Sequence, residues 1–320
     1  MLAEPELRAE LDRVAAAAGV RVVHAGDAAA VSRKTWAAAA AVVLDAAAAV
    51  RIGAARVLRL PEHEADLVGE LAEAAESSRD DRQRGHAVAV IGGCGGAGAS
   101  LLAVALAQAA GDALLVDLDP WGGGIELLLG GENTPGLRWP DLALQGGRLN
   151  WAAVRDALPR HRGVSVLSGT RRGHEVDAGP VHAVVDAGRR GAVSVICDLP
   201  RRFTDAAQAA LGAADLVVVV SRCDVRACAA TGALAPVLAA VNPNVGLVVR
   251  GPSPGGLRAA EIAGITGLPL LAAIKAQPQL GAQVERGGLR LGRRSALAVA
   301  ARQVLGVLPP AGTRRKGKAA

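Results

Sequence analysis

The sequence predicts an α/β protein whose main part is a doubly wound, mostly parallel sheet, preceded by a smaller α/β unit. Short runs rich in β-branched residues alternate with alanine-rich stretches of helical length, as in sheets that helices cover on both faces. A glycine-rich turn follows the run at residues 86–91. A polar and highly charged stretch, SSRDDRQRG at residues 77–85, separates a short N-terminal part from the rest.

The N-terminal part, residues 1–76, alternates between helical and strand patterns. We expect helices over residues 5–18, 28–38 and 62–76, and strands over residues 20–25, 41–44 and 56–60. Such an alternation predicts a small α/β domain. Residues 77–85 have the composition of an exposed linker between this domain and the next.

The larger domain is predicted to span residues 86–308. Its expected strands are residues 86–91, 113–118, 164–168, 193–198, 215–221, 245–250 and 269–274. Residues 122–150 are rich in glycine and turn formers and predict loops with one or two short helices. Residues 295–308 are apolar nearly all round and predict a packed C-terminal helix, followed by a basic flexible tail at residues 309–320.

The composition narrows the classes of partner and the compartment. The chain has one Phe, four Trp and no Tyr, so nucleic-acid binding by aromatic stacking is disfavoured. Its formal net charge of +6 suits an acidic surface such as DNA or anionic lipid, but it suits a plain soluble protein equally well, and DNA is not an expected partner. Four cysteines, Cys94, Cys197, Cys223 and Cys228, show no zinc-site spacing, and no signal-peptide pattern leads the chain. We therefore expect a cytoplasmic protein whose cysteines are small buried apolar residues.

The most informative stretch is HAVAVIGGCGGAGAS at residues 86–100, an apolar strand that runs into a glycine-rich turn and a hydroxyl residue. Glycines let successive N–H groups point at one anion, and the positive end of the following helix adds to the attraction. The predicted phosphate-binding residues are Gly95, Gly96, Ala97, Gly98, Ala99 and Ser100. Ala99 stands where such loops carry a lysine, so we expect anion binding more readily than hydrolysis.

Acidic side chains follow two further predicted strands. Asp117 and Asp119 leave the strand at residues 113–118, and Asp198 ends the strand at residues 193–198. A single Asp at a strand end is often only a turn former or helix cap, but three such features in this order are more specific. Together with the Ser100 hydroxyl they predict a Mg²⁺ site formed by Ser100, Asp117 and Asp198.

One alternative has a motif of its own. Residues 93–98 satisfy G-x-G-x-x-G, and Asp117 ends a second strand about twenty residues later, which is the dinucleotide-binding fingerprint of NAD proteins. We favour the phosphate loop because Ser100 opens the helix and because Asp198 is an acidic strand end that a dinucleotide site does not require.

These motifs resemble those of the deviant phosphate-loop ATPases of the ParA and MinD superfamily, and in particular its CpaE and TadZ branch. That family's loop is K-G-G-x-G-K-[ST]; here residues 94–100, CGGAGAS, keep the glycines and the hydroxyl and replace both lysines. Residues 117–122, DLDPWG, resemble the family's D-x-D-P-x-G, and Asp198 resembles the end of its Walker B strand. The resemblance covers residues 86–290, and residues 1–76 resemble a degenerate receiver domain in which Asp45 is the candidate phospho-acceptor.

The resemblance implies a protein for septum placement or for pilus and secretion-system assembly, with Asp117 and Asp119 as catalytic residues that orient water. Binding of ATP and Mg²⁺ is expected to be weak and hydrolysis slow or absent, and a non-catalytic scaffold is the alternative. Implied partners are division or pilus proteins, a second copy of the chain, and the inner face of the cell membrane.

One family residue, an adenine-binding Asn, is replaced by Arg250. Four arginines near strand ends, Arg201, Arg202, Arg222 and Arg250, are candidates to replace the lost lysine charge, although a solvated surface position is the simpler expectation for each.

Overall fold

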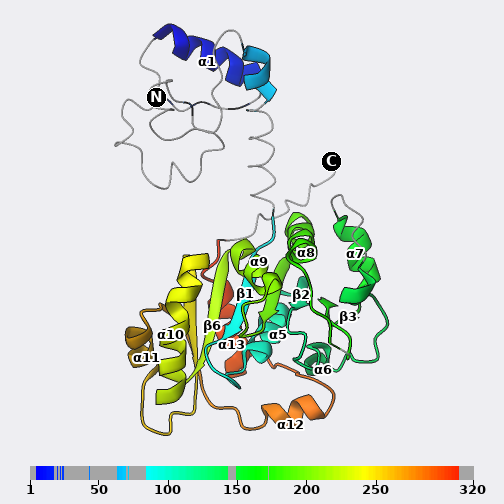
Figure 1. Cartoon of the computed structure of the whole chain (residues 1–320), viewed down its shortest axis with the longest axis vertical. Helices are drawn as coiled ribbons and strands as arrows, with labels where there is room; N and C mark the ends of the chain where they lie inside the picture. Colours follow the sequence, from blue (N-terminus) through cyan, green and yellow to red (C-terminus); the bar gives the residue numbers. More distant parts are fainter. Residues whose placement is uncertain are drawn as a thin grey trace. The chain divides into compact units, whose positions relative to one another are not determined.

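The structure is a computed structural model that describes residues 5–17, 20, 22, 24, 43, 63–69, 71, 84–142, 149–171 and 173–309. The chain divides into two compact units, Met1–Gln83 and Arg84–Ala320 (Figure 1). Each unit has a hydrophobic core of its own.

In the first unit, helix α1 (Pro5–Ala17) contributes Val14 and Ala15 to a small core that also contains Leu71. The Arg13 guanidinium donates to both carboxylate oxygens of Glu64, which begins a helical segment at residues 64–69. The helix predicted over residues 5–18 is thus confirmed, as is the described part of the one over 62–76. The other predicted elements of this unit, with the candidate phospho-acceptor Asp45, lie wholly or largely outside the described residues, as does most of the segment 77–85.

The second unit is built on an eight-stranded sheet with the strand order β3-β4-β2-β5-β1-β6-β7-β8. The strands are β1 (Ala87–Gly92), β2 (Ala113–Asp117), β3 (Arg160–His161), β4 (Val164–Leu167), β5 (Ser194–Leu199), β6 (Leu216–Arg222), β7 (Val245–Arg250) and β8 (Leu270–Ile274). Every neighbouring pair is parallel except β3 and β4, which are antiparallel. The predicted doubly wound, mostly parallel sheet is therefore confirmed.

Helices cover both faces of this sheet (Figure 1). The helices are α5 (Ala99–Ala110), α6 (Glu126–Leu129), α7 (Trp151–Ala157), α8 (Ala178–Arg190), α9 (Asp205–Ala213), α10 (Val225–Val241), α11 (Ala259–Thr266), α12 (Leu280–Glu285) and α13 (Ala296–Leu305), with a 3-10 turn η2 (Trp139–Asp141). Helices α5 and α13 bury their apolar residues against one face, and α8, α9 and α11 theirs against the other. The predicted packed C-terminal helix is α13.

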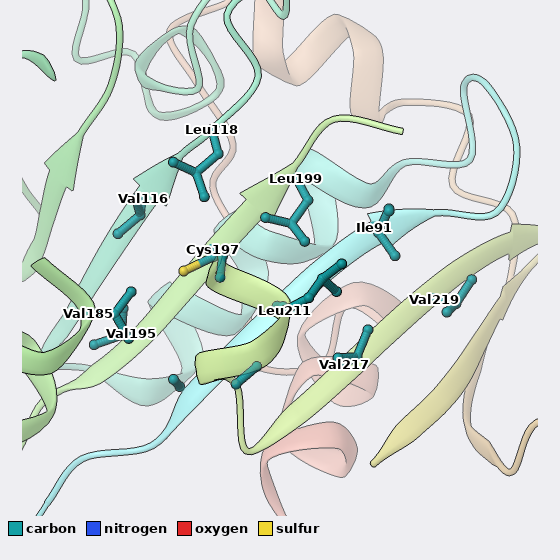
Figure 2. Close-up of a cluster of buried hydrophobic side chains, with 14 of the residues drawn as sticks. Ile91, Val116, Leu118, Val185, Val195, Cys197, Leu199, Leu211, Val217 and Val219 are labelled. Carbon is teal, nitrogen blue, oxygen red and sulfur yellow. The ribbon is translucent and has the colours of Figure 1, made fainter. Parts of the chain in front are cut away.

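Alternation along each strand divides the core into two layers. On β1, Ala89 and Ile91 belong to one buried cluster, and Val88 and Val90 belong to the other. Figure 2 shows part of the first cluster, formed by the labelled side chains Ile91, Val116, Leu118, Val185, Val195, Cys197, Leu199, Leu211, Val217 and Val219. Because all six residues of β1 are buried, the loop that follows it starts from a fixed backbone.

The seven strands predicted in this unit are present, with ends that differ from the prediction by a single residue at most positions. Strand β3 was not predicted, and the loop region 122–150 contains α6 and η2 as the one or two expected short helices. All four cysteines are buried and free, as expected. In the part of the chain that the structure describes, no helix is long and apolar enough to cross a membrane.

Candidate functional site

The glycine-rich loop connects the end of β1 to the start of α5. Gly98 is the N-cap of α5 and has φ 93° and ψ 32°, and Gly96 has φ 68°. Both conformations lie in the left-handed region that residues with a Cβ atom rarely adopt. A Cβ atom built on Gly95 or Gly96 would meet nothing within 4 Å, so this side of the loop is open. The chain therefore presents an accessible loop of main-chain groups at the positive end of a twelve-residue helix.

The inner side of the loop is tightly packed. A Cβ atom on Gly93 would overlap the Thr231 hydroxyl of α10. That hydroxyl is fixed in place, because Thr231 is fully buried and its oxygen lies 2.7 Å from the carbonyl oxygen of Ala227 and 2.9 Å from the Ser221 hydroxyl. The Gly93 N–H donates to the Val220 carbonyl at 2.8 Å. Helix α10 and strand β6 thus hold the start of the loop.

Asp198 lies in β5, directly beside β1 in the sheet, with Val90 as its register partner. The residue is 3% exposed, and its Oδ1 atom has no hydrogen-bond partner. Burial raises the pKa of Asp198 well above its usual value, the Asp117 carboxylate adds to this rise, and the Ser100 hydroxyl, which interacts with Asp198, opposes it. The unpartnered oxygen of Asp198 is a buried acceptor close to Ser100, the second residue of α5. It is available there to coordinate a cation.

Asp117 ends β2 and is the register partner of Asp198. Its Oδ1 accepts from the Asp119 N–H at 3.1 Å, and its Oδ2 accepts from the Ile125 N–H at 2.8 Å. Burial raises the pKa of Asp117 to about 6, although these two hydrogen bonds oppose the rise. The Trp139 indole N–H donates to the Asp117 carbonyl at 2.7 Å. Asp117 therefore anchors the loop of residues 118–125 as well as facing the site.

Asp119 lies farther out than Asp117. It is half-buried, and its Oδ1 accepts from the N–H of Trp121 at 3.0 Å. Trp121 is 71% exposed, and a Cβ atom built on Gly173 would lie 2.8 Å from its ring. Asp119 thus belongs to the exposed segment that Asp117 anchors.

The residues at the carboxyl ends of β1, β2 and β5 fit Mg²⁺ with a nucleotide phosphate. Of the predicted metal ligands, the structure brings Ser100, Asp117 and Asp198 to one place at the sheet edge. Among the described residues, no three His, Cys, Asp or Glu side chains form a metal cluster. Mg²⁺ at a phosphate loop needs no such cluster, because phosphate oxygens and waters supply most of its ligands.

Neither lysine of the related loops has a cationic replacement in the loop itself. Cys94 is buried, and Ala99 is the first residue of α5. Arg250, the last residue of β7, reaches the loop from outside it: a Cβ atom on Gly98 would overlap its Nη1 atom and lie 3.3 Å from its Cζ atom. The sequence supplied Arg250 as one of four candidates, and only the strand arrangement distinguishes it.

The strand order separates this unit from dinucleotide-binding folds. In doubly wound dinucleotide-binding sheets the first and second strands are neighbours. Here β5 lies between β1 and β2, so Asp198 rather than Asp117 is beside the glycine loop. The NAD alternative therefore lacks the sheet that its fingerprint requires.

Two relatives align with the whole length of the chain. It is 69% identical to the Mycobacterium tuberculosis proteins Rv3660c (strain ATCC 25618 / H37Rv) and MT3760 (strain CDC 1551 / Oshkosh), over 350 aligned positions that cover all of both chains. The chain belongs to the Rv3660c family. The family model described as "Rv3660c-like, CheY-like N-terminal domain" matches residues 1–52 and 46–82. The N-terminal α/β unit of this Rv3660c-family protein is thus CheY-like, as the resemblance to a receiver implied.

The second unit of the Rv3660c-family chain has the fold of ParA and MinD ATPases. The ParA family ATPase of Chlorobium tepidum TLS aligns with a TM-score of 0.61 and 15% identity, over 71% of this chain and all of that one. MinD of Aquifex aeolicus aligns with a TM-score of 0.56 and 20% identity, over 70% and 98%. MinD of Pyrococcus horikoshii OT3, complexed with Mg-ADP, aligns with a TM-score of 0.54 and 18% identity, over 68% and 93%. The predicted ParA/MinD-like fold is confirmed.

Proposed function

We propose that this protein is a positioning protein of the ParA/MinD type that binds Mg-ATP weakly and hydrolyses it slowly or not at all. The observation that carries the proposal is the unpartnered Oδ1 atom of Asp198, buried beside Ser100 where α5 begins. An isolated buried carboxylate oxygen is costly unless a ligand completes its coordination. Mg²⁺ on a nucleotide would do so.

The phosphate chain would lie on the open side of the loop, over the N–H groups of Gly95, Gly96, Ala97, Gly98, Ala99 and Ser100. Ser100 and Asp198 would hold Mg²⁺, with Asp117 behind them. When bound, Mg²⁺ neutralises phosphate charge and fixes the orientation of the phosphate chain.

The same geometry supports slow hydrolysis. Both carboxylate oxygens of Asp117 already accept main-chain hydrogen bonds, so this residue is less available to orient a water molecule. Asp119 has one oxygen engaged with Trp121. No lysine is present in residues 94–100, and such a lysine stabilises the charge that develops during phosphoryl transfer.

The cellular role we propose is the placement of a septum or of a pilus or secretion assembly, as in the CpaE and TadZ branch. The combination of a CheY-like unit with a ParA/MinD fold supports it. MinD of Aquifex aeolicus has been solved in a MinC:MinD complex, which supports protein partners. Membrane contact through α13 has no support, because Leu297, Ala301 and Val304 pack that helix into the core.

A scaffold with a vestigial nucleotide site is the second candidate, and the buried Cys94 thiol together with Ala99 favours it. Calorimetric titration of the full chain with Mg-ATP, Mg-ADP, and ATP with a chelator separates the two candidates. Nucleotide binding predicts Mg²⁺-dependent heat at millimolar ligand or below. If the wild-type protein gives no heat with either nucleotide, nucleotide binding is rejected and the scaffold is the remaining candidate.

Asp198→Asn is the matched variant, because it keeps the shape of the side chain and removes the charge. It is expected to abolish the Mg²⁺ dependence of binding while the protein stays folded. A fluorescent fusion in the native host then tests the role: a nucleotide-driven positioning protein should lose its localisation with Asp198→Asn, and a scaffold should keep it.

A further inference from the structure

The structure places an arginine from a distant part of the chain at the glycine loop. We propose that Arg250 supplies the cationic contact to nucleotide phosphates that the missing loop lysines would have made. This inference rests on the proposed nucleotide binding and adds the residue that makes binding without a lysine feasible. The ligand class is the phosphate chain of a nucleoside di- or triphosphate.

The placement follows from the sheet. Strand β7 is parallel to β6, which is parallel to β1, so the end of β7 lies two strands from the start of the loop. Arg250 is half-buried, and its guanidinium lies where a side chain on Gly98 would otherwise be. The Cδ atom is 3.7 Å from the Cβ position of Gly98, so the stem as well as the charged end approaches the loop.

Within the described part of the chain, the Arg250 guanidinium has neither a hydrogen bond nor an ion pair with another protein group, and outside the sheet Arg250 makes only one hydrogen bond, in which its main-chain carbonyl accepts from the Cys223 N–H. It therefore lies, without a carboxylate partner, near the positive end of α5. Two positive features in a partly buried place repel one another unless an anion lies between them. Asp198, whose Oδ1 lacks a partner, is a second and independent sign that a ligand completes this site.

The other three arginines are placed differently. Arg222 forms an ion pair with Asp224 at 3.0 Å, and Arg202 forms one with Glu175. Arg201 is exposed, and its Cγ and Cδ atoms lie 3.8 Å from a Cβ position on Gly92, before the loop begins. Arg250 is thus the one of the four candidates whose charged group meets the N-cap of α5.

The chemistry of arginine suits this task. A guanidinium is always charged and can donate two parallel hydrogen bonds to phosphate oxygens. In a phosphate loop with the usual lysine, the loop itself carries that cation. Here it would come from β7, a separate strand. The position also implies contact with phosphates rather than with adenine, because Gly98 belongs to the phosphate loop.

The test compares Arg250→Gln with Arg222→Gln in the full chain. The two arginines are register partners at the ends of β7 and β6, so each variant removes one charge from the same sheet edge. Binding of Mg-ATP and of magnesium tripolyphosphate is measured by calorimetry. We expect Arg250→Gln to weaken both ligands by about ten- to a hundredfold and Arg222→Gln to change neither by more than about twofold.

Three outcomes would overturn the inference. Unchanged or tighter binding by Arg250→Gln would show that the guanidinium makes no favourable contact with phosphate. If Arg250→Gln lost binding of Mg-ATP but kept binding of tripolyphosphate, Arg250 would contact the adenine instead of the phosphates. Wild-type protein that binds neither ligand would overturn the proposed nucleotide binding together with this inference, whereas the first two outcomes leave nucleotide binding intact.

A rescue experiment guards against a folding defect. Ala99→Lys restores a cation to the first position of α5, and in the Arg250→Gln background it should recover most of the lost affinity for both ligands. Thermal unfolding of each variant checks that the sheet is intact. If Ala99→Lys does not recover binding in a folded Arg250→Gln protein, Arg250 does not perform the role of the loop lysine.

Discussion

Asp117 and Asp198 are register partners at the ends of adjacent strands, yet only Asp117 has both of its carboxylate oxygens in main-chain hydrogen bonds. Asp198 keeps its Oδ1 without a partner in the same buried place. One carboxylate is thus committed to the loop that follows it, and the other is available to a ligand. This division gives Asp117 a structural task and supports the proposed binding role of Asp198.

The first prediction concerns pH. The pKa of Asp117 rises from the usual 3.8 to about 6, and that of Asp198 also rises, so the folded state binds more protons than the unfolded state between these values. The free energy of unfolding contributed by these groups therefore increases as the pH falls from about 7 to about 4, by about 3 kcal/mol for Asp117.

Asp198→Asn tests the part of this pH dependence that comes from Asp198. Without Mg²⁺ or nucleotide, the variant should be more stable than wild type at pH 7.5, because no charge is buried, and the difference should shrink as the pH is lowered. Urea unfolding at several pH values measures it. A variant that is less stable than wild type at pH 7.5 would show that the Asp198 charge is compensated within the protein.

The second prediction concerns the anchor of residues 118–125. Asp117→Ala leaves the N–H groups of Asp119 and Ile125 without their acceptor and should lower the free energy of unfolding by about 2–4 kcal/mol at pH 4, where the carboxyl is protonated in the folded state and removing it relieves little buried charge. Asp198→Asn serves as the control, because it alters the register partner without removing a main-chain contact. Equal stability of Asp117→Ala and wild type in urea unfolding would contradict the anchoring role.

The third prediction concerns the packed side of the loop. Gly93→Ala forces a methyl group into the Thr231 hydroxyl and should destabilise the protein by about 1–3 kcal/mol. In the double variant with Thr231→Ala, part of that loss should be recovered, because the obstructing hydroxyl is gone. Gly95→Ala, which adds its Cβ to open space, should change stability by less than about 0.5 kcal/mol. Additive losses at Gly93 and Thr231 would mean that the two residues do not meet.

The fourth prediction concerns Trp121. Its side chain is exposed, and its main-chain N–H donates to the Asp119 carboxylate. A ligand that rearranges this segment should therefore change the fluorescence of Trp121. We expect Mg-ATP to alter the emission of wild-type protein and Trp121→Phe to remove most of that change. Trp139→Phe should keep it, because Trp139 is buried against Asp117. The same emission change in wild type and Trp121→Phe would contradict the coupling.

The sheet was predictable because its strands are buried runs of β-branched residues, each followed by a turn. Strand β3 was not, because Arg160 and His161 form a two-residue antiparallel pair without an apolar pattern. The same physical limit applies to the site. Sequence spacing located Asp198 at a strand end, but the different states of Asp117 and Asp198 depend on main-chain N–H groups whose positions only the folded loop defines.

Arg250 shows the limit most clearly. Arg250 is far from Gly98 in the sequence, and the sequence gives no reason to prefer it over the three other arginines near strand ends. The order of β1, β6 and β7 and the side-chain pairing of Arg222 with Asp224 distinguish them. Contacts of this kind follow from tertiary structure and leave no local pattern.

A crystal structure of the full chain grown with Mg²⁺ and a non-hydrolysable ATP analogue tests the central claim most directly. We predict phosphate density over the N–H groups of residues 95–100, with Mg²⁺ held by Ser100 and Asp198 and with the Arg250 guanidinium on a phosphate oxygen. An empty loop with Asp198 Oδ1 still lacking a partner, or a nucleotide bound elsewhere, would contradict it.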